Sequence, residues 1–197
     1  SMRGTKGQAQ RVIDDIDKDL LDKITDRCIR FSFGEHDLIN LVGYDIIFRG
    51  PSCRSDLPEI KAEQLRGAVV TSEIELMLEM APGKIIGVTG STGAETTARL
   101  IYSILKENGN DCYLGGNIGE PLFTELKNMT KETIVVLQIN NMQLAEIETS
   151  PDIAVITNIE IEKSNAIDIG QVEEKNHYEN IFKYQNSKGI VVLDYGL

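Results

Sequence analysis

One segment constrains the fold more than any other: a strand, a glycine-bounded turn and a helix follow one another at residues 85–100, IIGVTGSTGAETTARL. Ile85–Thr89 has the apolar run of a buried strand, Gly90–Gly93 forms the turn, and Thr96–Glu107 carries one apolar helical stripe. The succession is typical of a phosphate-binding loop, in which backbone N–H groups converge and the helix N-terminus adds its positive dipole. A plain strand–turn–helix junction fits the same pattern, so the motif alone leaves both interpretations open.

The chemistry of a working phosphate loop is missing from this turn. Such a loop ends in Gly-Lys-Thr or Gly-Lys-Ser, whose Lys reaches the phosphates and whose hydroxyl holds magnesium. Ala94 stands at the Lys position and Glu95 at the hydroxyl position. Two like charges about 4 Å apart repel by about 4 kcal/mol at an effective dielectric of about 20, so this carboxylate opposes phosphate binding. The degenerate nucleotide loop therefore comprises Gly90, Ser91, Thr92, Gly93, Ala94, Glu95, Thr96 and Thr97.

The rest of the chain alternates between strand and helix patterns. The runs at residues 134–139 and 153–159 are apolar without alternation, as in a parallel sheet covered on both faces. Further predicted strands are 28–33, 44–48, 68–71, 113–114 and 190–193, and further predicted helices are 12–24, 36–41, 59–64 and 73–80. This order predicts an α/β fold with mostly parallel sheets and flanking helices. Ala81-Pro82-Gly83 predicts a boundary between a partial first domain, residues 1–80, and a truncated central domain, residues 84–197.

Taken together, the motifs resemble those of the Mur ligases, a family of ATP-dependent amide-forming enzymes. Residues 87–93 (GVTGSTG) are similar to the family's phosphate loop, Gly115–Leu122 (GGNIGEPL) to its GGNIGxPL segment, and residues 153–159 (IAVITNI) to the strand before its Pro-Asp/Asn-His motif. The order and spacing match over roughly residues 40 to 195, best with the D-glutamate-adding branch. The resemblance implies the amino-terminal part of such an enzyme: a partial UDP-sugar-type domain and a truncated P-loop-type central domain.

The resemblance also assigns roles to single residues. It implies that Asn117 contacts a UDP-muramoyl substrate, with Asn140 and Gln143 in the neighbouring segment LQINNMQL. It places Gln138 where the family has a magnesium-binding Glu, and Lys163 where a His binds a second metal. A protonated amine cannot bind a metal, so no metal site is expected. At the family's carbamylated Lys, the register leaves His177 and Tyr178 as alternatives.

These replacements predict a degenerate active site. The resemblance implies a protein of peptidoglycan precursor synthesis type that has lost its ATP and magnesium residues, so we expect no catalysis and no cofactor, although the family uses ATP and magnesium. The expected remaining activity is binding of a UDP-N-acetylmuramoyl precursor or of a protein. One alternative is an active ATP-dependent ligase in which substitutes such as Thr96 and Gln138 hold the metal. A scaffold domain without a small ligand is the other.

Charge and cysteine content limit the partners and the setting. The chain has 31 acidic and 20 basic residues, a net charge of -11, which repels nucleic acid and anionic membranes. It has three cysteines, none in a CxxC pair, which predicts a reducing, cytoplasmic setting. A central domain cut short would leave an unpaired sheet edge, so we expect self-association, as a homodimer.

Overall fold

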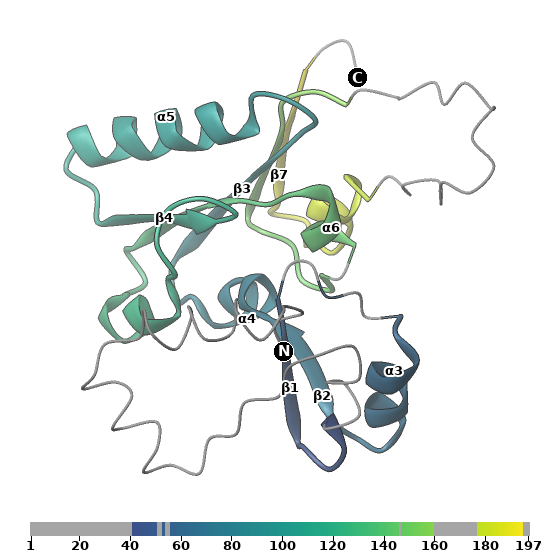
Figure 1. The fold of residues 1–197 in the computed structure, drawn as a ribbon. Helices are drawn as coiled ribbons and strands as arrows, with labels where there is room; N and C mark the ends of the chain where they lie inside the picture. Colours follow the sequence, from purple (N-terminus) through teal and green to yellow (C-terminus); the bar gives the residue numbers. More distant parts are fainter. Residues whose placement is uncertain (1–40, 51–52, 54–55, 146, 160–176, 195–197) are drawn as a thin grey trace, which may run out of the picture. The chain divides into compact units, whose positions relative to one another are not determined.

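The computed structural model describes residues 41–50, 53, 56–145, 147–159 and 177–194. The chain divides into two compact units, Ser1–Thr71 and Ser72–Leu197 (Figure 1). The helix predicted at 12–24, the strand at 28–33 and most of the helix at 36–41 lie outside the described residues. No helix in the described ranges is long and apolar enough to cross a membrane.

The described part of the first unit is a strand–helix–strand arrangement. β1 (Ile46–Arg49) and β2 (Val69–Ser72) form a two-stranded sheet, and α3 (Pro58–Leu65) connects them. Pro58 begins α3, where its missing N–H costs nothing because the first helical N–H groups have no partner within the helix. Ile47 of β1 and Ile60 of α3 are buried and supply apolar packing in this unit.

The second unit is built on a five-stranded sheet in the order β4-β5-β3-β6-β7, with every pair parallel. The predicted α/β fold with a parallel sheet is therefore confirmed. The strands are β3 (Lys84–Thr89), β4 (Cys112–Gly116), β5 (Ile134–Gln138), β6 (Ile153–Ile156) and β7 (Ile190–Leu193). Successive side chains of a strand point to opposite faces, so each of the buried strands contributes to two cores.

One face of the sheet is covered by α5 (Ala94–Glu107), which lies along β3, β4 and β5 (Figure 1). Its buried Ala94 and Ala98 pack on Val88 and Val136 in a small cluster. The small side chains of α5 at these positions let the helix lie close to the strands. The first turn of α5, which follows the glycine turn, is thereby fixed to the sheet.

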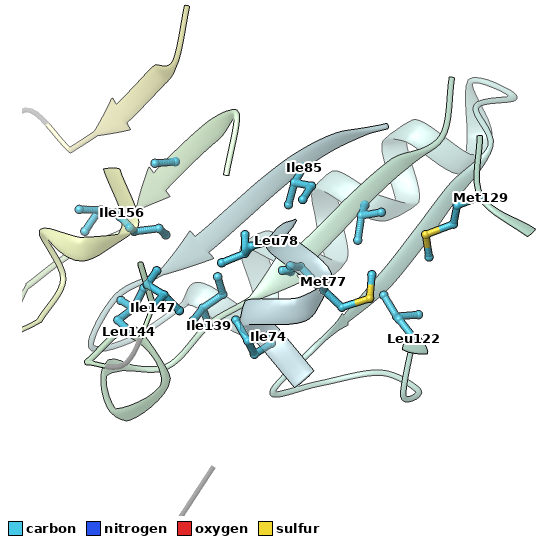
Figure 2. Packing of buried hydrophobic residues seen from close by; sticks show 14 residues of the cluster. Ile74, Met77, Leu78, Ile85, Leu122, Met129, Ile139, Leu144, Ile147 and Ile156 are labelled. Atoms are coloured by element: carbon cyan, nitrogen blue, oxygen red, sulfur yellow. The ribbon is translucent and has the colours of Figure 1, made fainter. Parts of the chain in front are cut away.

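The other face holds the larger core, shown in Figure 2. It is covered by α4 (Glu73–Met80), α6 (Asn141–Leu144) and α7 (Asn180–Lys183), and the 3-10 helix η2 (Phe123–Asn128) lies against α4. Ile74, Met77 and Leu78 of α4 pack there with strand residues such as Ile85 and Leu137. A fully buried side chain of this kind stabilises the fold by roughly 1.5–3 kcal/mol.

The boundary between the units lies at Thr71 and Ser72, before α4, whereas the sequence places it at Ala81-Pro82-Gly83, after that helix. The packing of α4 explains the difference, because its apolar face belongs to the core of the second unit. Pro82 and Gly83 mark the end of the helix. Both residues lie inside the second unit, between α4 and β3.

Candidate functional site

The carboxyl ends of the parallel strands bring the predicted site residues to one edge of the sheet. Gly90 follows β3, Asn117 follows β4, Asn140 lies just after β5, and Thr157 follows β6. α5 leaves β3 on one face, while the connection from β5 through α6 runs on the other. In open α/β sheets, ligands bind outside the strand ends at such a change of face. The topology therefore makes this edge the candidate site.

The glycine turn has the predicted strand–turn–helix geometry, and two of its positions require glycine. Gly90 has φ +148°, and a Cβ placed on it would lie 2.1 Å from Oγ1 of Thr157. Gly93 is the N-cap of α5 in the left-handed region, with φ +76°. A side chain is disfavoured at such φ values, so both glycines serve the backbone path from β3 into α5.

The turn is bonded to the segment that follows β6. Ser91 N donates to the carbonyl oxygen of Asn158 at 3.1 Å, and Thr92 N donates to Asn158 Oδ1 at 2.9 Å. Asn158 Nδ2 donates to Thr92 Oγ1 at 2.5 Å, and Thr157 Oγ1 donates to the carbonyl oxygen of Thr92 at 2.8 Å. Two backbone donors of the turn are therefore used inside the protein, whereas a phosphate-binding turn directs such donors at its anion.

The apolar run at 153–159 predicts a strand that includes Thr157 and Asn158, and no sequence motif gives these two residues a role in the site. The available signal was a polar pair directly after the apolar run IAVI, at the carboxyl end of a parallel strand. Their contacts with the turn depend on β6 lying beside β3, and the sequence does not reveal that neighbourhood.

The two replaced positions of the turn differ in environment. Ala94 is 4% exposed and its methyl packs among Val88, Ala98 and Val136. Glu95 is exposed, and its Oε1 accepts a hydrogen bond from Nε of Arg99, one helical turn later, at 3.0 Å. The ion pair partly offsets the negative charge predicted to repel phosphate, although exposed pairs of this type are weak. Thr96 is exposed and Thr97 half-buried, and both lie within the first turns of α5.

The structure brings Asn117 and Asn140 together. Asn140 Nδ2 donates to Asn117 Oδ1 at 3.1 Å, and Asn117 N donates to the carbonyl oxygen of Gln138 at 2.8 Å. Gln143 is used differently: it forms a capping box with Asn140, in which each side-chain oxygen accepts a backbone N–H of the other residue. Asn117 and Asn140 thus form an amide pair at the sheet edge, and the capping box with Gln143 holds the side chain of Asn140 in place.

Gln138, at the end of β5, is 7% exposed, and its Oε1 has no hydrogen-bond donor within the described part of the chain. The hydroxyl of Thr89, at the end of β3, is fully buried and has no partner among the same residues. Buried polar atoms of this kind are uncommon in folded proteins. Both are neutral, so these two side chains, at the ends of β3 and β5, offer no negative charge to a metal ion.

These residues do not fit magnesium-ATP. The turn offers Ala94 where a cation is needed, and Gln138, which the resemblance sets at a carboxylate position, is a neutral amide. Within the described ranges, no group of three or more His, Cys, Asp and Glu side chains could hold a metal ion. Hard cations such as Mg²⁺ bind through carboxylates and substrate phosphates. Gln138, at the end of β5, is no carboxylate, and Ala94 gives the turn no cation for the phosphates.

Two more predicted positions have distinct outcomes. Lys163 lies outside the described residues. Of the alternatives His177 and Tyr178, Tyr178 reaches the glycine turn, because its hydroxyl lies 3.2 Å from Ser91 Oγ. His177 instead donates its backbone N–H to Asn141 Oδ1 at 2.8 Å. The geometry thus places the tyrosine hydroxyl beside the turn.

A buried carboxylate of α4 is hydrogen-bonded to the segment between α6 and β6. Glu75 is 9% exposed and accepts hydrogen bonds from Glu148 N and from Thr149 Oγ1, each at 3.2 Å. Burial raises the pKa of Glu75, and the hydrogen bonds from Glu148 and Thr149 oppose that rise. The carboxylate links α4 to the segment that leads from α6 into β6.

Comparison with known proteins points to one group of enzymes. The chain is 41% identical over 180 residues to the UDP-N-acetylmuramoylalanine–D-glutamate ligase of Acetivibrio thermocellus, which covers 90% of this chain and 38% of that protein. It is 36% identical over 183 residues to the enzyme of the same name from Clostridium acetobutylicum, covering 92% of this chain and 39% of that protein. The chain thus spans less than two fifths of the length of these relatives. No family model matches it.

A solved structure agrees with the fold. The UDP-N-acetylmuramate:L-alanyl-gamma-D-glutamyl-meso-diaminopimelate ligase from Neisseria meningitides aligns with a TM-score of 0.51 over 93% of this chain and 62% of that chain. The sequence identity in this alignment is 16%, so the likeness concerns the fold alone. The resemblance stated from the sequence motifs is confirmed by the two sequence relatives.

Proposed function

This chain is related to the Mur ligases over most of its length, and we propose that it is a Mur ligase-type module of peptidoglycan precursor synthesis that does not itself catalyse ATP-dependent ligation. The observation that carries the proposal is the glycine turn, where a buried alanine and an exposed, ion-paired glutamate stand in place of Lys and a hydroxyl residue. A reducing, cytoplasmic setting, expected from the three cysteines, is part of this proposal.

The loss of catalysis follows from charge. Phosphoryl transfer depends on cations that neutralise charge as it develops on the transferred group. Arg99, a cation in the second turn of α5, is paired with Glu95, and the chain as a whole carries a charge of -11. The hydrogen bonds to Asn158 also occupy two backbone N–H groups of the turn, those of Ser91 and Thr92. Each of these features disfavours a bound triphosphate.

Precursor binding is supported by the amide pair at the sheet edge. Asn117 is exposed, and its Oδ1 is oriented by Asn140, which is in turn fixed by the capping box with Gln143. Side-chain amides both donate and accept hydrogen bonds, which suits sugar hydroxyls, an N-acetyl group and a lactyl or peptide carbonyl. The relatives are named for a UDP-N-acetylmuramoylalanine substrate, and we propose a precursor of this class as the ligand.

The second candidate is an active ligase, favoured by the 41% identity to an enzyme named for that reaction. It would need Gln138 Oε1, which lacks a donor in the described chain, and the hydroxyl of Thr96 to serve as metal ligands. This reading predicts that Ala94→Lys sharply raises affinity for ATP. An unchanged affinity in a folded variant would exclude the turn as a latent nucleotide site.

A thermal-shift titration of the whole chain separates the candidates. A ligand at about 100 times its dissociation constant adds roughly 2.7 kcal/mol, or about 5–10 °C for a unit of this size. We expect a shift with UDP-N-acetylmuramoyl-L-alanine and none with magnesium-ATP. Asn117→Ala should abolish the shift, while Asn128→Ala, at an exposed position in η2, should leave it unchanged. A shift with ATP alone would favour the active ligase, and no shift with either would favour a scaffold.

Self-association is part of the proposal as well. β7 lies at the edge of the sheet, and all four of its side chains, Ile190 to Leu193, are 40–53% exposed. Exposed apolar edge strands pair readily with other chains. Light scattering over a wide concentration range should show a dimer, and a monomer at every concentration would contradict this.

A further inference from the structure

α4 begins with two carboxylates that reach distant parts of the chain. Ser72 is the N-cap, and its side chain accepts from Glu75 N, which places Glu73 and Glu75 in the first turn. Acidic residues here are ordinarily explained by the helix dipole. In this structure each of the two also accepts a hydrogen bond from a remote segment: Glu75 from Glu148 and Thr149, and Glu73 from Leu122. The dipole alone does not explain such specific partners.

The hydrogen bond to Glu73 lies at the carboxyl end of the segment that begins at Asn117. Oε1 of Glu73 accepts the backbone N–H of Leu122 at 3.1 Å, across 49 positions of sequence. Leu122 is 4% exposed and belongs to the core beneath the sheet. It is also the residue before η2, whose first N–H groups lack partners within the helix. A carboxylate supplies a charge-assisted acceptor for one of them, a stronger bond than a neutral acceptor would give.

The segment from Asn117 to Leu122 is therefore held at both ends. At its start, Asn117 N donates to the carbonyl oxygen of Gln138. At its end, Leu122 is bonded to Glu73 and packs on Gly115, where a Cβ would come within 2.6 Å of Leu122 Cδ1. A short loop that is bonded at both ends has little conformational freedom. If the bond at Leu122 is lost, we expect the whole segment back to Asn117 to become more mobile. The two ends rest on different elements, β5 and α4.

We propose that Glu73 is a positioning residue that fixes the Asn117 loop in its binding conformation. Its effect on ligand affinity rests on the proposed function, since it acts through Asn117. Its effect on the loop does not. The carboxylate does not contact the ligand. By holding the loop in one conformation before binding, it reduces the conformational entropy that the loop loses on binding.

The test uses the whole chain and three variants. Glu73→Ala removes the acceptor, Glu73→Gln keeps an oxygen while removing the charge, and Glu79→Ala removes an exposed carboxylate from the other end of α4 as a matched control. Because Gln and Ala both lose the interaction with the helix dipole, a difference between them reports the hydrogen bond. Hydrogen exchange of the Asn117 and Leu122 amides is measured by NMR, and affinity for UDP-N-acetylmuramoyl-L-alanine by calorimetry.

We expect Glu73→Ala to raise the exchange rates of both amides at least tenfold relative to the amides of β3, and to weaken precursor binding about tenfold. Glu73→Gln should stay within about threefold of the unaltered chain, and Glu79→Ala should change neither quantity. Unchanged exchange at Leu122 in Glu73→Ala would overturn the proposal. Faster exchange at Leu122 with unchanged exchange at Asn117 would overturn it too, since Glu73 would then be only structural. If the unaltered chain binds no precursor, the proposed function fails, and the exchange rates still decide the role of Glu73.

Discussion

Replacing Gly90 by alanine should destabilise the second unit more than replacing Gly93, although both glycines have positive φ. At Gly93, φ is +76° and a Cβ would meet nothing within 4 Å, so only backbone strain of about 1–2 kcal/mol is added. At Gly90, φ is +148°, and the new Cβ would lie 2.1 Å from Thr157 Oγ1. That hydroxyl must then move.

The magnitude at Gly90 follows from what the hydroxyl of Thr157 holds. Its single O–H proton lies within reach of the carbonyl oxygens of Thr92 and Thr89, at 2.8 and 3.3 Å, so the two distances describe one shared hydrogen bond that contributes about 1 kcal/mol. With backbone strain of about 1–3 kcal/mol, the expected loss of unfolding free energy is roughly 2–4 kcal/mol for Gly90→Ala. Backbone strain alone would give similar losses at the two glycines.

Urea unfolding followed by far-UV circular dichroism measures both variants, and a double-mutant cycle tests the cause. Thr157→Ala removes the oxygen that the new Cβ would meet, so Gly90→Ala should cost less in that background by at least about 1 kcal/mol. Equal losses for Gly90→Ala and Gly93→Ala, or no coupling between Gly90 and Thr157, would refute the contact between the turn and the end of β6.

Three other changes test the core and the edge. Ala94→Lys forces a long charged side chain onto a buried position and should lower the free energy of unfolding by about 1–3 kcal/mol in denaturant titrations, with no gain in ATP affinity; a stable variant that binds ATP would contradict this. Gln138→Met removes an oxygen that lacks a donor in the described chain and should raise the melting temperature. A decrease of more than about 1 kcal/mol in the free energy of unfolding would show that the amide forms hydrogen bonds in the folded protein. Burial raises the pKa of Glu75 above its ordinary value of 4.5, so the folded state holds this proton more tightly and the unaltered chain loses stability as pH rises from about 4.5 through the folded-state pKa. The stability of Glu75→Gln relative to the unaltered chain should therefore increase with pH across that window, and a flat difference in urea titrations between pH 4.5 and 8 would refute it.

Much of the second unit could be predicted from local sequence patterns. The apolar runs gave β3, β5 and β6 because strands buried on both faces tolerate few polar residues. The helix at Glu73–Met80 was predicted with the bounds observed, and α5 begins two residues before its predicted start, since Ala94 and Glu95 already lie in its first turn. The short α6, α7 and η2 were not predicted, because four to six residues carry too little periodicity.

The site was predictable only in part. Glycine spacing identified the turn, and the replaced Lys position was visible in the sequence at once. The contacts that define the edge, between Asn158 and Thr92 and between Glu73 and Leu122, join residues 66 and 49 positions apart. Such pairs depend on the strand order β4-β5-β3-β6 and on the packing of α4, and neither can be read from local patterns.

A turnover assay shows whether the chain keeps the Mur ligase frame without its ATP chemistry. Phosphate release is measured with magnesium-ATP, UDP-N-acetylmuramoyl-L-alanine and D-glutamate, with the ligase of Acetivibrio thermocellus as positive control. We expect phosphate release no faster than in the absence of the chain, for the unaltered protein and for Ala94→Lys alike. Release that requires both the precursor and D-glutamate would contradict it and establish an active ligase with substitute residues.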